Sequence, residues 1–219
     1  MMTRFKICGI RDVKHAIVAA HAGAEFLGFV FVPGVRRQLS GEIAQSIIKK
    51  YRDLIGPKGP RLVGLFANQP VEDVNDIVRR CDLNLVQLCG DEPPEYWNEV
   101  QVPIIRQIKV RDDIPQCDAA SEVLVQIREV VKHCHIPLLD KYQSGALGGT
   151  GLKFEWDIAK AISKRYDFML AGGLTPANVK LAITQVRPWA VDVSSGVESN
   201  GVKDSKQIIA FAEEVKQSA

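Results

Sequence analysis

Short apolar runs alternate with longer amphipathic stretches along almost the whole chain. There are eight such runs, and most are close to continuously apolar, which is typical of strands buried on both faces of a parallel sheet. They cover residues 5–8, 26–31, 61–66, 83–88, 103–110, 136–139, 168–170 and 190–193. The pattern therefore predicts eight short strands, separated by segments long enough to hold helices.

The intervening segments place apolar residues three or four positions apart, the spacing of one helix face. The predicted helices begin near Val13, Ser40, Val71, Thr175 and Ile208, with less regular candidates at 122–132 and 156–164. Ser40 has the side chain of an N-cap, and Pro176 follows Thr175 at the position where a first helical turn accepts proline. Helices therefore separate most pairs of strands.

Strands that alternate with helices pair in parallel and are joined by right-handed crossovers. Eight such units predict a closed (β/α)8 TIM barrel, and we expect a single domain over residues 1–219. An open doubly wound sheet is the alternative. It is disfavoured because the first strand leads into Cys8-Gly9-Ile10 without the GxGxxG fingerprint of a dinucleotide site.

Composition excludes several functional classes. The formal net charge of +2 gives no electrostatic reason to expect a nucleic-acid or membrane partner. No apolar run reaches the roughly 18 residues of a membrane span, and the first residues lack the apolar region of a secretory signal, so we expect a cytoplasmic protein. The five cysteines are scattered, which argues against a disulfide framework. His133-Cys134-His135 lacks a second pair of ligands and is interpreted as a loop or helix end entering a strand.

The chemistry of such a barrel lies at the carboxyl ends of its strands. After the seventh predicted strand comes Gly172-Gly173, and after the eighth comes Ser194-Ser195-Gly196. Phosphate sites in these barrels are commonly built from these two loops, because small residues let backbone N–H groups approach the phosphate oxygens. The two loops therefore predict a phosphate-bearing ligand, although each alone could be an ordinary tight turn.

Two reactive side chains stand at strand ends. Cys8 ends the first strand, where it is either a small buried hydrophobe or a thiol activated by nearby positive charge. Asp140 follows the sixth strand, where it is a cap, an ion-pair partner or a proton donor. Lys6 points the same way as Cys8 and needs a carboxylate partner inside a barrel, for which Asp192 is the candidate.

Two arginines follow the second strand. Arg36 and Arg37 are either solvated surface side chains or donors to a carboxylate on the substrate. The guanidinium group suits the second role because its planar fork matches a carboxylate with two parallel hydrogen bonds. The residues alone leave both interpretations open.

These blocks, in this order, resemble the signature segments of the phosphoribosylanthranilate isomerase family. Any one block is modest evidence, but together they span nearly the whole chain. The matching segments are Lys6-Ile7-Cys8-Gly9, Phe29-Val30-Phe31 through Arg37, Val86-Gln87-Leu88 with Gly90-Asp91-Glu92, Leu139-Asp140, Gly148-Gly149-Thr150-Gly151 with Trp156, Leu170-Ala171-Gly172-Gly173-Leu174 with Pro176 and Asn178, and Asp192-Val193-Ser194-Ser195-Gly196-Val197-Glu198 with Gly201, Lys203 and Asp204.

The resemblance implies an isomerase of tryptophan biosynthesis that carries out an Amadori rearrangement without cofactor or metal. Its substrate would be N-(5-phosphoribosyl)anthranilate and its product 1-(2-carboxyphenylamino)-1-deoxyribulose 5-phosphate. The family's general acid falls on Asp140 and its general base on Cys8. The resemblance also places Arg37 on the anthranilate carboxylate. Gly172, Gly173, Asp192, Ser194, Ser195 and Gly196 complete the predicted substrate-binding set.

The chain departs from the family's pattern at Cys89, where the family commonly has histidine, and over residues 111–135. Two other functions stay open at this point. One is a different phosphosugar isomerase or synthase barrel, such as indole-glycerol-phosphate synthase, which uses lysine and glutamate instead of a first-strand cysteine. The other is a barrel that binds a phosphosugar without catalysis. The family also allows fusion to, or association with, other enzymes of the tryptophan pathway.

Overall fold

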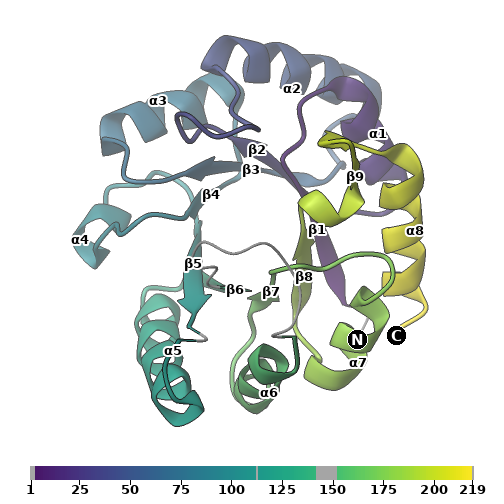
Figure 1. The fold of residues 1–219 in the computed structure, drawn as a ribbon. Helices are drawn as coiled ribbons and strands as arrows, with labels where there is room; N and C mark the ends of the chain where they lie inside the picture. Colours follow the sequence, from purple (N-terminus) through teal and green to yellow (C-terminus); the bar gives the residue numbers. More distant parts are fainter. Residues whose placement is uncertain (1–2, 112, 142–151, 219) are drawn as a thin grey trace.

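The computed structural model describes residues 3–111, 113–141 and 152–218, and these form a closed barrel surrounded by helices (Figure 1). Eight parallel strands pair in chain order, and β8 closes the ring by pairing with β1. The strands are β1 (Arg4–Cys8), β2 (Phe26–Val30), β3 (Arg61–Phe66), β4 (Leu85–Leu88), β5 (Ile104–Val110), β6 (Ile136–Lys141), β7 (Met169–Leu170) and β8 (Ala190–Val193). The predicted TIM barrel is confirmed.

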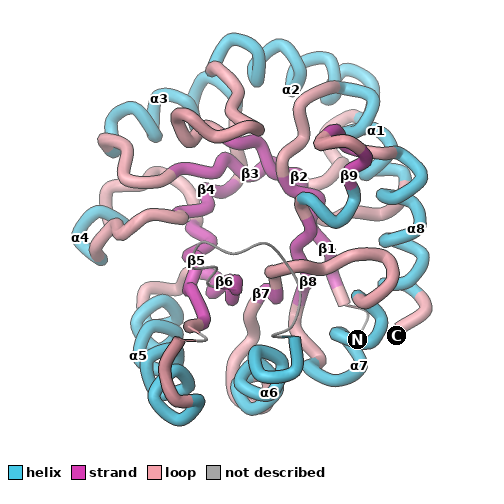
Figure 2. The backbone as a smooth tube through the Cα atoms, viewed as in Figure 1, coloured by secondary structure: helices cyan, strands magenta, loops and turns pink. Residues whose placement is uncertain are grey.

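A helix follows each strand and covers the outside of the barrel, as Figure 2 shows with strands in magenta and helices in cyan. After β8 the chain forms a 3₁₀ turn and a small hairpin before the last helix. The elements are α1 (Val13–His21), α2 (Gly41–Ile55), α3 (Val71–Cys81), α4 (Pro94–Trp97), α5 (Gln116–Lys132), α6 (Leu152–Ile162), α7 (Val179–Val186), η1 (Ser195–Val197), β9 (Glu198–Ser199), β10 (Val202–Lys203) and α8 (Ser205–Lys216).

Local capping explains where several helices begin. The Ser40 side chain accepts a hydrogen bond from the Ile43 N–H, so the predicted N-cap of α2 is confirmed. The prediction that α7 starts after Thr175 is wrong, since the helix begins at Val179. The Asn178 side chain accepts from the Thr175 N–H and donates to the Gly173 carbonyl, and these bonds hold a separate turn ahead of the helix.

Two apolar clusters stabilise the barrel. The larger one fills the layer between the sheet and the helices. The smaller one fills the barrel interior and contains Cys8, Phe26, Val30, Val63, Leu65, Leu85, Ile105, Leu138, Met169 and Ala190. Since side chains alternate across a strand, the residues two positions further along each strand also point inward, toward the carboxyl-end opening. We call this opening the barrel mouth.

Aromatic rings and arginines close the opposite, amino-terminal end. The Phe26 and Trp189 rings lie 5.9 Å apart between centroids. The Arg61 guanidinium stands 4.4 Å from the centre of the Phe26 ring, and that of Arg4 stands 4.8 Å from the Trp189 ring. Such cation–π contacts keep the charge near water while covering apolar rings. These four side chains therefore cover the apolar interior at the amino-terminal end of the barrel.

The segment before β6 contains His135, a titratable side chain that packs against aromatic rings. The His135 ring lies 5.9 Å from the Trp97 ring, and its Nδ1 is buried without a hydrogen-bond partner among the described residues. Burial, together with neighbouring His133, lowers the pKa of His135. The folded state therefore binds this proton less readily than the unfolded state, whose histidine pKa is about 6.5, and stability is lost as pH falls below that value.

We expect the melting temperature to fall more steeply between pH 7 and pH 5 in the wild type than in a His135→Phe variant. Phenylalanine keeps the ring contact with Trp97 but takes up no proton. Thermal unfolding followed by circular dichroism at several pH values measures the difference. His21→Phe is the control, because that ring lies on the exposed end of α1. Parallel pH curves for wild type and His135→Phe would contradict the prediction.

Candidate functional site

Polar side chains line the barrel mouth directly above the apolar interior. Lys6 and Cys8 come from β1 and Gln87 from β4, while Gln107 and Asp140 come from β5 and β6. Cys8 itself faces the barrel interior, and each of the others is two residues from a side chain that does. Because strand side chains alternate between the two faces, all five point into the mouth. The predicted pair, Cys8 and Asp140, therefore shares one opening.

A buried ion pair supports Cys8 from below. Lys6 is fully buried, and its Nζ lies 3.0 Å from Oδ1 of Asp192, with which it pairs in register between β1 and β8. The prediction that Lys6 needs the Asp192 carboxylate is confirmed. Burial acts to lower the pKa of Lys6, but the charges of Asp192 and Cys8 outweigh it, so the pKa is raised and the ammonium persists.

The Cys8 thiol is buried, with 5% of the residue exposed. Burial raises its pKa because the thiolate loses water, whereas the nearby Lys6 and Lys203 charges act in the opposite direction. A Cβ added at Gly28 would lie 3.1 Å from the Cys8 Sγ, so a glycine on β2 leaves room for the sulfur. The thiol is therefore held in place, and its pKa is raised overall, because burial and the Asp192 charge outweigh the two lysines.

The opposite wall of the mouth carries Asp140. Gln107 Nε2 donates a hydrogen bond of 2.6 Å to Oδ2 of Asp140. Cys89 stands nearby at the end of β4, accepting a 3.5 Å contact from Gln87 Nε2, and its charge would interact with those of both Cys8 and Asp140. Burial raises the pKa of Cys89 to about 12, so this thiol stays neutral.

The Glu198 carboxylate pairs with Arg36 and Arg37, which follow β2, and with Lys203 of β10. Arg37 donates from Nε to Oε1 of Glu198 at 2.6 Å and from Nη2 to Oε2 at 2.9 Å. Glu198 also pairs with Arg36 at 2.6 Å and with buried Lys203 at 2.8 Å. Burial acts to raise the pKa of Glu198, but the hydrogen bonds from Arg37 and Lys203 outweigh burial and lower the pKa to about 2. Arg37 is thus fixed by two parallel bonds that leave its Nη1 outside the pair.

Close packing brings Arg37 and Ser194 next to Cys8. At Gly9, which has φ of +80°, a Cβ would lie 2.5 Å from the Arg37 Cδ and 3.3 Å from the Ser194 Oγ. Only glycine adopts this conformation readily and also leaves that space. The Ser194 Oγ donates to the Cys8 carbonyl at 3.2 Å. The loops after β1, β2 and β8 therefore meet beside the thiol.

The two predicted phosphate loops are in contact. A Cβ at Gly196 would collide with the Leu174 carbonyl oxygen, so glycine is required where the loop after β8 packs on the loop after β7. Ser194 and Ser195 lead into η1, and Gly172 and Gly173 have φ of +90° and +67°. The role of these residues in phosphate binding stays a prediction, and the Gly148–Gly151 segment lies outside the described residues.

Comparison with known proteins identifies the family. The sequence profile described as N-(5'phosphoribosyl)anthranilate (PRA) isomerase matches residues 5–214. This chain belongs to the phosphoribosylanthranilate isomerase family. N-(5'-phosphoribosyl)anthranilate isomerase of Roseiflexus castenholzii is 46% identical, with 94% of each chain covered. The enzyme of Dehalococcoides mccartyi is 40% identical over 98% of this chain and 96% of its own length.

Solved structures of the phosphoribosylanthranilate isomerase family have the same fold. The Thermotoga maritima enzyme superposes with a TM-score of 0.84 at 34% identity, covering 99% of this chain and 100% of that one. A second structure, with a TM-score of 0.80 and 32% identity, holds reduced 1-(o-carboxyphenylamino)-1-deoxyribulose 5-phosphate and covers 99% and 100% of the two chains. The resemblance and the prediction of an isomerase of tryptophan biosynthesis are confirmed. Because the family is that of an isomerase, the alternative of a synthase barrel such as indole-glycerol-phosphate synthase is rejected.

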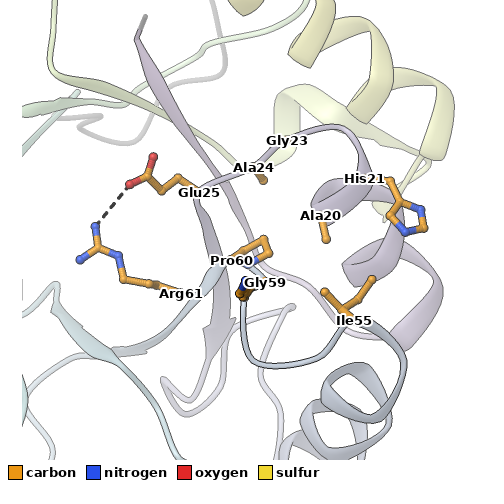
Figure 3. Close-up of a pocket in the computed structure, with 10 residues that line it drawn as sticks. Ala20, His21, Gly23, Ala24, Glu25, Ile55, Gly59, Pro60 and Arg61 are labelled. Carbon is orange, nitrogen blue, oxygen red and sulfur yellow. Dashed lines mark ion pairs between the residues drawn. The ribbon is translucent and has the colours of Figure 1, made fainter. Parts of the chain in front are cut away.

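One cavity lies far from the barrel mouth. A pocket of about 470 Å³ opens at the amino-terminal ends of β2 and β3, where Ala24, Gly59 and Ile55 form part of its lining and Glu25 pairs with Arg61 (Figure 3). It is at the opposite end of the strands from Cys8. Among the described ranges, no three His, Cys, Asp or Glu residues group as a metal site, and no helix is long and apolar enough to cross a membrane.

Sequence reasoning missed three residues of this site: Gln107, Glu198 and Lys203. Glu198 and Lys203 appeared only as members of a family block, because nothing local shows that a hairpin places both against Arg37. Gln107 occupies an inward position of β5, and alternation from Ile105 could have pointed to it. Asp192, predicted to bind substrate, is engaged by Lys6, and its contact with substrate stays a prediction.

We expect Glu198→Gln to raise KM for the substrate and to destabilise the protein by about 1–3 kcal/mol. The amide cannot balance Arg37 and buried Lys203, so Arg37 loses its fixed orientation and Lys203 loses its counter-charge. Steady-state kinetics and urea unfolding measure the two effects. Glu42→Gln is the control, because Glu42 also pairs with an arginine but is exposed on α2. An unchanged KM would contradict the positioning of Arg37 by Glu198.

Proposed function

We propose that this chain converts N-(5'-phosphoribosyl)anthranilate to 1-(2-carboxyphenylamino)-1-deoxyribulose 5-phosphate, with Asp140 as general acid and Cys8 as general base. The observation that carries the proposal is that both side chains project into one barrel mouth from β6 and β1. Membership of the isomerase family, and the product analogue held by a relative of the same fold, support it. The reaction needs one group to give a proton and another to remove one.

Ring opening is the first step. Asp140 transfers a proton to the furanose ring oxygen, and the bond from that oxygen to C1' breaks. The lone pair of the anthranilate nitrogen forms the new C=N bond, which leaves an iminium ion and an Asp140 carboxylate. Gln107 already donates to that carboxyl group, so the negative charge forms beside an N–H. Acid catalysis of this kind contributes typically about 10²- to 10⁴-fold.

Proton removal from C2' is the second step. The Cys8 thiolate takes this proton, the C–H electrons form a C1'=C2' bond, and the C=N electrons return to nitrogen. The resulting enolamine, which carries the 2'-hydroxyl, tautomerises to the ketone. Lys6 and Lys203 act to favour the thiolate against the effect of burial. Their positive charge therefore supports Cys8 as a base.

The remaining groups bind the two ends of the substrate. Arg37, oriented by Glu198, supplies a cation for the anthranilate carboxylate at the rim beside Gly9. Gly172, Gly173 and the Ser194–Gly196 segment supply backbone N–H groups for the phosphate. With the carboxylate bound by Arg37 and the phosphate bound by these loops, the reacting C1' and C2' atoms would lie between the two binding sites, next to Cys8 and Asp140.

The test is to generate the substrate in situ from anthranilate and phosphoribosyl pyrophosphate with a phosphoribosyltransferase. Purified protein is then added in a chelator-containing buffer, and loss of the substrate's fluorescence is followed. We expect rapid loss with wild type and a rate about 10²- to 10⁴-fold lower with Asp140→Asn.

Asp53→Asn is the matched control, because it removes an exposed carboxylate on α2 and should keep wild-type turnover. A wild-type protein that binds the reduced product analogue but does not consume substrate would instead be a non-catalytic phosphosugar-binding barrel. Full turnover by Asp140→Asn would reject Asp140 as the acid.

A further inference from the structure

Gln107 makes a short, directed contact with the proposed acid. Its Nε2 lies 2.6 Å from Oδ2 of Asp140, slightly shorter than the usual range of about 2.7–3.2 Å for N–H···O hydrogen bonds. In the β5–β6 ladder Gln107 pairs with Leu138 and Lys109 pairs with Asp140, so the hydrogen bond crosses diagonally between neighbouring strands. Ile105 and Leu138 pack in the barrel interior one inward position below. Packing thus fixes the backbone under both partners.

The chemistry of an amide decides which carboxyl oxygen can carry the proton. The NH₂ group only donates, so the Asp140 oxygen that faces it must accept. When Asp140 is protonated, its hydrogen therefore belongs on Oδ1. The hydrogen bond also strengthens as the acceptor becomes a carboxylate, which is the change that accompanies proton donation.

We propose that Gln107 is a positioning residue that orients the Asp140 carboxyl group and keeps its transferable proton on Oδ1. The inference rests on the proposed role of Asp140 as general acid. As the proton moves from Oδ1 to the ring oxygen and the C1' bond breaks, Oδ2 keeps its N–H donor and shares the new charge. Interactions that strengthen in the transition state raise kcat.

An uncharged donor suits this task better than a cation. A lysine or arginine at hydrogen-bond distance lowers a carboxyl pKa by about 1–3 units and would leave Asp140 without a proton to give. Titratable groups near Asp140 among the described residues include Lys109, paired with it in the β5–β6 ladder, and the Cys89 thiol at the end of β4. Gln107 supplies a directed N–H to Asp140 without adding another charge near the carboxyl group.

Two substitutions at Gln107 separate positioning from simple packing. Gln107→Met keeps the length and bulk of the side chain but removes the donor. Gln107→Lys keeps a donor and adds a positive charge. The readouts are kcat, KM and the pH midpoint of the Asp140 carboxyl ¹³C resonance, assigned by its loss in Asp140→Asn.

We expect Gln107→Met to lower kcat about 10- to 100-fold with KM changed less than about threefold, since misplacing a reacting group costs up to about 10²-fold. The Asp140 midpoint should rise in Gln107→Met and fall in Gln107→Lys. The control, Ile105→Val, loosens packing on the same face of β5 and should leave the midpoint and kcat unchanged.

Two outcomes would overturn the inference: wild-type kcat in Gln107→Met, or an Asp140 midpoint that moves in neither variant. Failure of the proposed function looks different. If Asp140→Asn itself keeps wild-type turnover, Asp140 is not the acid, whatever the Gln107 variants do. If Asp140→Asn is inactive while Gln107→Met turns over normally, only the positioning role is rejected.

Discussion

Cys8→Ala should lower kcat about 10²- to 10⁴-fold while KM stays within about a factor of three, because the thiolate acts on C2' during the reaction and not on substrate binding. The buried Sγ lies against Gly28, where a methyl group leaves the surroundings intact. The in situ fluorescence assay measures both constants. Cys8→Ser should not restore activity, since a hydroxyl ionises far less readily than a thiol.

Cys81→Ala is the matched control for Cys8→Ala. Cys81 is also buried, but it ends α3 outside the barrel, with its Sγ 3.7 Å from the Gly41 carbonyl oxygen. Its variant should lose some stability and keep wild-type kcat. If Cys8→Ala retained most of its activity, another group would have to take the C2' proton and the proposed mechanism would fail.

Lys6→Met should destabilise the protein by about 3–5 kcal/mol, the usual loss when one member of a buried ion pair is removed. Lys6 is fully buried and Asp192 is 8% exposed, so the remaining carboxylate would lose its ion-pair partner at a position with little access to water. Urea unfolding measures the change. In the wild type, the raised pKa of Lys6 means that its contribution is complete below the unfolded-state value of about 10.4 and is lost as pH rises through the folded-state value.

The double variant Lys6→Met/Asp192→Leu separates the cost of an unpaired charge from the value of the pair. It removes both charges together, and replacing a buried pair with apolar groups is often neutral. We therefore expect it to be more stable than Lys6→Met alone. Losses that simply add would show that the two charges do not interact.

The regular elements of this fold could be predicted from local pattern where burial is uniform. Strands 61–66 and 190–193 were predicted with their observed bounds, because apolar residues and glycine fill all but one position of each, Arg61 and Asp192. The prediction that the sixth strand ends at residue 139 is wrong, since β6 continues to Lys141. Asp140 and Lys141 pair with Lys109 and Val110, but polar residues at a strand end look like loop.

Helix boundaries show the same limit. The fifth helix was predicted at 122–132 and begins at Gln116, where the sequence has few apolar residues to mark a helix face. Pro115, at the N-cap position, was the available signal. The sixth was predicted at 156–164 and observed at Leu152–Ile162.

The candidate site divides in a similar way. Cys8, Asp140 and Arg37 could be selected because they follow apolar strands in blocks that resemble one family. Glu198 could not be selected, since its contact with Arg37 joins positions 161 residues apart. Alternation along β5 could have placed Gln107 in the barrel mouth, but not against Asp140, which is 33 residues away. Those contacts depend on strand register and on one hairpin, and neither is encoded in a local pattern.

The closure of the barrel between β1 and β8 has a consequence for synthesis on the ribosome. Lys6 and Asp192, and likewise Cys8 and Ser194, are 186 residues apart. The ammonium of Lys6 therefore stays in water, and the thiol beside it stays uncovered, until β8 has been translated. A nascent chain that stalls before β8 would carry the cysteine without these surroundings, so catalytic competence arises only after β8 has been made.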